Sequence, residues 1–106
     1  MLHCDFCYAE VKPGKATRIY AKDFDQYVLP PEGQVRIGDI EIRGIRSLGD
    51  WCACPDCIVL IRANDWDALV EKVVKIESAH GLPAPVVREF LRVSWANLRK
   101  NLEVIQ

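Results

Sequence analysis

The residues best suited to chemistry in this chain of 106 residues are two pairs of cysteines with the same spacing. Cys4 and Cys7 form a Cys-x-x-Cys motif near the start of the sequence, and Cys54 and Cys57 form a second one in the middle. Each motif, called a hook below, can bring two sulfurs to one cation, and Zn²⁺ accepts four such ligands in a closed tetrahedron at about 2.3 Å. The spacing therefore predicts one structural zinc ion bound by these four cysteines.

A zinc ion with four cysteine ligands has no open coordination position for a substrate. The sequence therefore predicts a protein that is not an enzyme, with no catalytic residue and no small-molecule substrate. A zinc deaminase would need a His-x-Glu arrangement and ligands on a Pro-Cys-x-x-Cys segment. Neither His3 nor His80 has a glutamate two residues later, and Pro55 lies inside the second hook. We reject this class.

Other roles for the cysteines remain open at this point. Free cysteines can be small buried hydrophobic residues, and a Cys-x-x-Cys motif can be a redox centre when one thiolate lies at a helix N-terminus. The hooks begin the chain or follow a predicted strand, which favours metal binding. Cys52 could reach the metal only from a distorted hook, so we expect a core or interface thiol there. We expect His3 to be solvated. His80 lies at the C-terminal end of the first predicted helix, where it interacts favourably with the helix dipole.

Length and composition are those of one ordinary globular domain, residues 1–106. Hydrophobic residues make up 50% of the chain and charged residues 27%, which is unlike a disordered protein. No basic and apolar leader follows Met1, and no run approaches the roughly 20 apolar residues of a membrane span. We therefore expect a soluble cytoplasmic protein with no membrane partner, in which the cysteines are reduced.

The segment between the hooks predicts a small antiparallel sheet. Residues 16–21 have the β-branched and aromatic content of a strand, and prolines place a surface loop at 29–33. A two-residue turn at Gly38 and Asp39 predicts a hairpin with its apolar residues on one face. Its register pairs Gln34 with Arg43, Val35 with Ile42, Arg36 with Glu41 and Ile37 with Ile40. A strand at 51–53 then leads into the second hook.

Two amphipathic helices are predicted after the second hook, at residues 64–80 and 85–103. Asn64 is the expected N-cap of the first helix, and Gly81 ends it. The core-facing stripe of this helix is Trp66, Leu69, Val70, Val73 and Ile76, with Lys72, Lys75 and Glu77 outside. The stripe of the second helix is Val87, Phe90, Leu91, Ser94, Leu98 and Leu102. The short connection between them predicts an antiparallel helical hairpin.

These elements predict an α+β fold. Residues 1–62 form a zinc-ribbon-like region, a small antiparallel β-sheet with the four-cysteine site, and the C-terminal helical hairpin packs on that sheet. We find no internal repeat beyond the two hooks and no domain boundary.

Four stretches of the chain, residues 4–7, 20–24, 49–57 and 60–69, are similar to the pattern Cys-Asp-Phe-Cys, Tyr-x-x-x-Asp-Phe, Asp-Trp-x-Ala-Cys-x-x-Cys, Leu-Ile and Asp-Trp-x-x-Leu. The second stretch departs from it by one position, because two residues and not three separate Tyr20 from Asp23. This pattern resembles that of a group of small, uncharacterised bacterial and phage proteins. The resemblance implies a zinc-ribbon-like domain, with the cysteines of both hooks as ligands and Cys52 on a position that the pattern leaves open. It implies no activity. The hairpin around residues 38–39 and the last helix have no counterpart in the pattern.

Basic residues occur around the predicted hairpin and along the last helix. They are Arg36, Arg43 and Arg46 in the first region and Arg88, Arg92, Arg99 and Lys100 in the second. They could contact phosphates, and zinc ribbons often belong to nucleic-acid machinery, which is an analogy of fold only. The formal net charge of the whole chain is -1, which is unlike a typical nucleic-acid-binding domain.

Trp95 lies beside the apolar stripe of the last helix, between Arg92 and Arg99. An exposed tryptophan in that setting has the composition of an interface anchor, although a tryptophan that covers the core explains it equally well. The sequence thus favours a non-enzymatic, zinc-stabilised module, a small bacterial or phage accessory or regulatory protein that binds a protein partner or its own copy through the last helix. The alternative is a nucleic-acid-binding accessory protein that uses the arginine-rich hairpin and the last helix.

Overall fold

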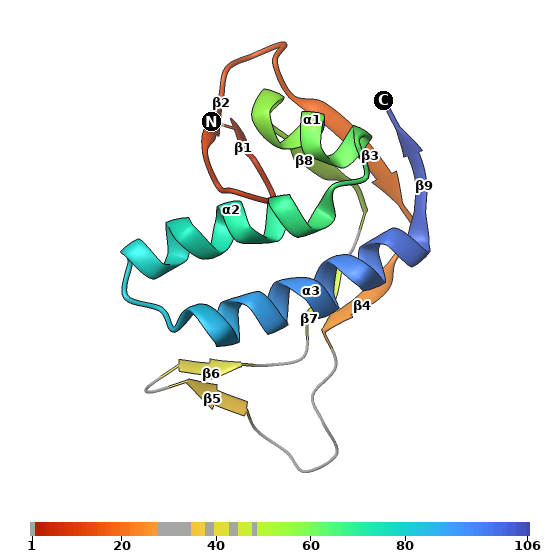
Figure 1. The fold of residues 1–106 in the computed structure, drawn as a ribbon. Helices are drawn as coiled ribbons and strands as arrows, with labels where there is room; N and C mark the ends of the chain where they lie inside the picture. The colour runs from red at the N-terminus through yellow and green to blue at the C-terminus, as the bar shows by residue number, and fades with distance from the viewer. Residues whose placement is uncertain (1, 28–34, 38–39, 43–44, 48) are drawn as a thin grey trace.

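The computed structural model describes residues 2–27, 35–37, 40–42, 45–47 and 49–106. Within these residues the chain forms small antiparallel sheets and three helices, with the last helix packed on the strands and the four cysteines in one cluster (Figure 1). This confirms the predicted α+β class. None of the described helices has the length and the apolar character needed to cross a membrane.

The central sheet has three antiparallel strands in the order β8, β3, β9. These strands are Trp51–Ala53, Thr17–Ala21 and Leu102–Ile105 respectively. The predicted strands at 16–21 and 51–53 are therefore confirmed. The prediction of a helix up to residue 103 is wrong, because Lys22 N donates to Asn101 O at 3.0 Å and the chain then pairs with β3 as a strand.

The other described strands form three antiparallel pairs. They are β1 (Leu2–His3) with β2 (Glu10–Val11), β4 (Phe24–Tyr27) with β7 (Ile45–Ser47), and β5 (Val35–Ile37) with β6 (Ile40–Ile42). In the last pair Val35 faces Ile42, Arg36 faces Glu41 and Ile37 faces Ile40, which confirms the predicted hairpin register. The predicted turn at 38–39, the pair of Gln34 with Arg43 and the loop at 29–33 lie outside the described residues.

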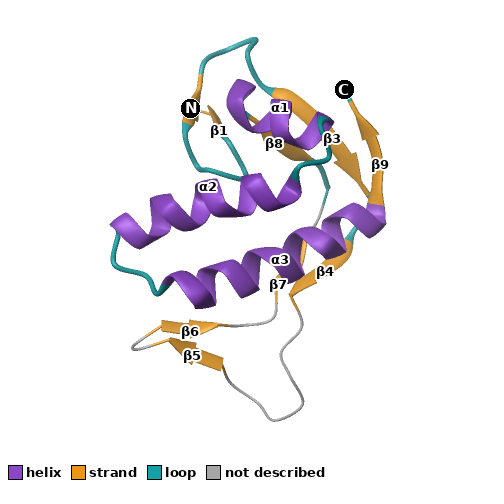
Figure 2. Ribbon diagram, viewed as in Figure 1, coloured by secondary structure: helices purple, strands orange, loops and turns teal. Residues whose placement is uncertain are grey.

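The three described helices are α1 (Pro55–Arg62), α2 (Trp66–Ala79) and α3 (Ala84–Asn101) (Figure 2). The α2 and α3 helices lie side by side and run in opposite directions, as the predicted hairpin requires (Figure 1). The α1 helix is not predicted by the sequence analysis. It starts at the second hook itself, and it packs against α2 and β8.

The start of α2 differs from the prediction by one capping residue. Asp65, not Asn64, is the N-cap, and its Oδ1 accepts a hydrogen bond from Ala68 N at 3.2 Å. Asn64 has a left-handed φ of 56° and turns the chain between α1 and α2. Its Oδ1 accepts a hydrogen bond from Trp66 Nε1 at 3.0 Å. Gly81 follows the helix with a φ of +89°, which agrees with the predicted stop.

The predicted core stripes of both helices are largely confirmed. In α2 the buried residues are Trp66, Leu69, Val70, Val73 and Val74, while Ile76 is partly buried. In α3 the buried residues are Val87, Ser94, Trp95 and Leu98, with Phe90 and Leu91 partly buried. These faces pack against each other and against the strands.

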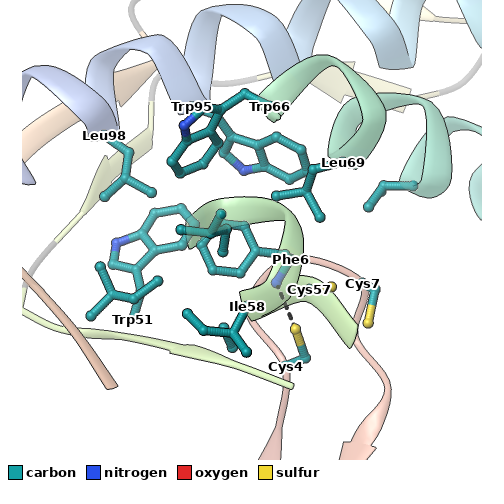
Figure 3. Packing of buried hydrophobic residues seen from close by; sticks show 14 of the residues in the cluster. Cys4, Phe6, Cys7, Trp51, Cys57, Ile58, Trp66, Leu69, Trp95 and Leu98 are labelled. Atoms are coloured by element: carbon teal, nitrogen blue, oxygen red, sulfur yellow. Dashed lines mark hydrogen bonds between the residues drawn. The ribbon is translucent and has the colours of Figure 1, made fainter. Parts of the chain in front are cut away.

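The centre of the core is an aromatic cluster, defined here as Phe6, Trp51, Trp66 and Trp95 (Figure 3). The Phe6 ring lies 5.2 Å from the Trp51 ring and 5.4 Å from the Trp95 ring, measured between centroids. Trp95 is only 3% exposed, so the prediction of an exposed interface anchor there is wrong and the core interpretation holds. Its ring lies in the core, where it contacts the rings of both Phe6 and Trp66.

Candidate metal centre

The two hooks bring four cysteine sulfurs together, as the sequence predicts. The Sγ atoms of Cys4, Cys7, Cys54 and Cys57 all lie within 4.8 Å of one another, and all four residues are buried. Two ligands of a tetrahedral ion with bonds of 2.3 Å would lie about 3.8 Å apart. The Sγ atoms of Cys7 and Cys54 are 3.6 Å apart. The cluster can therefore hold one metal ion.

The first hook is a tight turn between β1 and β2. Cys4 N donates to Ala9 O at 2.9 Å, and Tyr8 N donates to Cys4 O at 3.0 Å. Tyr8 adopts a left-handed φ of 65°, which a residue with a side chain rarely does. The hydrogen bonds of this turn and the left-handed conformation of Tyr8 place both sulfurs of the first hook on the same side.

The second hook is the N-terminus of α1. Cys54 is the N-cap, its Sγ accepts a hydrogen bond from Cys57 N at 3.4 Å, and Pro55 occupies the first helical turn. Our sequence argument against a redox centre, that neither hook begins a helix, is therefore wrong for this hook. The N-terminus of α1 therefore lies at the cluster, beside the two sulfurs of the first hook.

Asp5 connects the first hook to β8, the strand that leads into the second hook. Its backbone N donates to Cys52 O at 2.8 Å, and its carboxylate Oδ2 accepts a hydrogen bond from Cys52 N at 2.6 Å. Burial raises the pKa of the Asp5 carboxyl, and the bond from Cys52 acts in the opposite direction. Cys52 itself stays outside the sulfur cluster and is partly exposed. Its backbone, rather than its thiol, contributes to the centre.

Backbone N–H groups donate to sulfurs of both hooks. Phe6 N donates to Cys4 Sγ at 3.4 Å (Figure 3), and Cys57 N donates to Cys54 Sγ. Burial raises the pKa of the Cys7 thiol, and a hydrogen bond from the backbone of Ala9 opposes that rise. Such hydrogen bonds stabilise thiolates and orient metal ligands.

The thiols of this cluster cannot all ionise by themselves. The interaction with Cys57 lowers the pKa of Cys4 to about 4, against the effect of burial. The same interaction, together with burial, raises the pKa of Cys57 far above its usual range. One thiolate thus keeps its neighbour protonated. A divalent cation removes this conflict, because it allows all four sulfurs to carry negative charge at once.

Lys72 is a residue of the site that the sequence analysis places on the exposed side of α2. It is partly buried, and its Nζ donates to Cys57 Sγ at 3.5 Å. Burial acts to lower the pKa of Lys72, but the charges of the cluster, Cys57 first, outweigh it and raise that pKa. Its position three residues after Leu69 and four before Ile76 puts it at the border of the apolar stripe, which is the signal that could have found it.

The other candidate residues lie away from the cluster. His3 stacks its ring on Tyr8, with centroids 5.3 Å apart, and His80 is the exposed C-cap of α2. Arg92 and Lys100 are exposed on α3, whereas Arg88 pairs with Glu71 and Arg99 lies over the Trp66 ring. Arg36 belongs to β5 and Arg46 to β7, and Arg43 lies outside the described residues.

No protein-family model, curated protein or solved structure shows significant similarity to this chain. The resemblance to small bacterial and phage proteins therefore stays a prediction. The residues of that pattern have structural roles here: Asp23 Oδ1 accepts a hydrogen bond from Gly49 N at 2.9 Å, and the ring of Phe24 stacks on that of Trp51.

Proposed function

We propose that the protein is a non-enzymatic interaction module whose fold is held by one structural Zn²⁺ ion. The observation that carries the proposal is the set of four buried sulfurs within 4.8 Å of one another. Cys7 and Cys54 are 47 positions apart, so one ion would join the start of the chain to its middle. Zinc is the metal that best suits four thiolates in a closed tetrahedron. With every position taken by the protein, no reaction at the metal is proposed.

The state of the cysteines supports a cytoplasmic location. All five cysteines are free, and thiols remain reduced in the cytosol. We include this compartment in the proposal, because a zinc centre of four thiolates needs its ligands unoxidised.

The surface that we propose for a protein partner is the exposed side of the first hook, defined as Leu2, His3 and Tyr8 and called the hook surface below. Tyr8 is 77% exposed and Leu2 48% exposed. The Tyr8 ring stacks on His3 and follows Cys7 directly, so a metal ion at the cluster would fix its position. A rigid exposed tyrosine suits an interface because it offers a large apolar ring and a hydroxyl at low entropic cost.

The nucleic-acid alternative has less support. Of the basic residues on α3, Arg88 Nε lies 2.8 Å from Glu71 Oε1, and the Arg99 guanidinium lies 5.4 Å from the centroid of the Trp66 ring. Both cations already have partners inside the molecule. Arg92 and Lys100 are the other basic candidates on α3, and both are exposed, so this helix offers two further charges to phosphates. Binding to generic DNA with a steep salt dependence would favour this alternative instead.

The test compares capture of host proteins by three baits, namely the wild type, Tyr8→Ser, and Lys75→Ser as an exposed control on α2. We expect one partner to be enriched by the wild type and the control and lost with Tyr8→Ser, while the zinc content of all three stays the same. Retained capture by Tyr8→Ser would contradict the hook surface. Sedimentation of the purified wild type would show whether the partner is a second copy of the chain.

A further inference from the structure

The four sulfurs of the cluster differ in the donors that reach them. Cys4 and Cys54 accept hydrogen bonds from the backbone N–H groups of Phe6 and Cys57. Within the described part of the chain, the donor from outside the cysteines that reaches Cys57 Sγ is the ammonium of Lys72, at 3.5 Å. The main chain thus donates to Cys4 and Cys54, whereas a side chain donates to Cys57.

The position of Lys72 is fixed by the helix that carries it. Its neighbours on the core side of α2, Leu69 and Val73, are buried, and α2 packs against α1, which contains Cys57. A partly buried ammonium is unfavourable unless an anion lies beside it. Four thiolates and one divalent cation carry a net charge of -2, which supplies that anion. The geometry therefore fits a charged sulfur cluster with a cation at its edge.

We propose that Lys72 is a positioning residue of the metal centre. Its N–H···S hydrogen bond orients the Cys57 thiolate toward the ion and reduces the nucleophilicity of that sulfur, the role that backbone donors have at Cys4 and Cys54. This inference rests on the proposed zinc centre and deepens it. It makes retention of the ion depend on the position of α2, because α2 holds the ammonium against the cluster.

The first experiment measures zinc affinity in competition with a chromophoric chelator. The variants are Lys72→Met, which keeps the length of the side chain but removes the donor, and Lys72→Arg, which restores a charged donor. Lys75→Met is the matched control, since Lys75 is exposed on the same helix. Loss of an outer-shell partner typically costs 10–100-fold in metal affinity, and we expect about that loss for Lys72→Met. Lys72→Arg should recover most of it, and Lys75→Met should match the wild type.

The second experiment follows the order in which N-ethylmaleimide modifies the cysteines of the zinc-loaded protein. In this reaction the thiolate sulfur forms a bond to one alkene carbon, the other carbon takes a proton from water, and the sulfur leaves the metal. Peptide mass spectrometry identifies the modified residue. In Lys72→Met we expect Cys57 to react first and faster than in the wild type, while Cys4 and Cys54 keep their backbone donors and their rates.

The two experiments separate the proposals. Equal zinc affinity and an unchanged order of modification in Lys72→Met would overturn the role of Lys72 and leave the zinc centre intact. A wild type that binds no zinc would instead contradict the proposed function. Far-UV circular dichroism at saturating zinc checks the fold of each variant. If Lys72→Met is unfolded, Lys72→Leu, which also lacks a donor, replaces it and must lose affinity relative to Lys72→Arg.

Discussion

The two hooks share the Cys-x-x-Cys spacing, yet different local structures build them. The first hook is a turn between β1 and β2 and ends at Tyr8, whose φ is 65°. The second hook joins β8 to α1, with Cys54 as the N-cap and Pro55 in the first turn. The first is held by the hydrogen bonds of its turn and by contacts with distant parts of the chain, and the second by the start of its own helix. Equal spacing therefore does not mean equal structure.

The residues inside each hook account for this difference. Asp5 holds the backbone of Cys52, and Phe6 lies in the aromatic cluster. Pro55 and Asp56 are exposed, and they serve α1 as its first-turn proline and acidic residue. The comparison shows that the cysteines specify the sulfur cluster, whereas the two residues between each pair determine which contacts hold that hook in place.

The largest expected effect is the loss of one ligand from either hook. Cys7→Ser and Cys57→Ser should each lose a large share of the free energy of unfolding, since structural zinc contributes on the order of 10 kcal/mol of apparent binding energy at neutral pH. Thermal unfolding followed by circular dichroism measures this loss. Cys52→Ser is the matched control, because Cys52 lies outside the cluster, and it should stay close to the wild type. Equal stability of Cys52→Ser and Cys57→Ser would contradict the account.

A smaller effect should separate the inner residues of the hooks. Phe6→Ala removes a buried ring from the aromatic cluster and should lower the free energy of unfolding by about 3–5 kcal/mol. Asp56→Ala removes only an exposed first-turn carboxylate and should cost at most about 1 kcal/mol. Chemical denaturation of the zinc-loaded proteins gives both values. Similar losses in the two variants would show that the hooks are supported alike.

The sequence predicted the cluster of four cysteines and much of the fold because both depend on spacing. Four cysteines in matched motifs specify a cluster wherever the chain folds back, and the pairing of Arg36 with Glu41 specifies a hairpin register. The α1 helix was missed because its eight residues are too short for a helical period to stand out. The local signal for the start of α1 was Pro55, a proline directly after the N-cap residue Cys54.

Other features depend on tertiary contacts that no local pattern contains. Leu102 continues the apolar stripe of α3 in sequence, but the chain gains a pairing with Ala21 of β3 by leaving the helix. Trp95 and Lys72 have similar positions at the borders of their stripes. Only the packing of α2, α3 and the first hook shows that Trp95 joins the core and that Lys72 reaches a sulfur.

The smallest expected effect has opposite signs in the two hooks, at the residue that follows each second cysteine. Tyr8 has a left-handed φ, where glycine avoids a steric cost of about 1–2 kcal/mol. Tyr8→Gly should therefore be more stable than Tyr8→Ala by about 1 kcal/mol. Ile58 lies in α1, where glycine is less stable than alanine by about 1 kcal/mol, so Ile58→Gly should be the weaker of that pair. If glycine were more stable than alanine at both positions, or less stable at both, the hooks would not differ as described.

The most direct test of the zinc centre is X-ray absorption at the zinc edge, combined with elemental analysis of protein purified under reducing conditions. The account predicts one zinc per chain with four sulfur neighbours at about 2.3 Å and no nitrogen or oxygen neighbour. Protein without zinc, or a zinc ion with an oxygen or nitrogen ligand in place of one of the sulfurs, would contradict it.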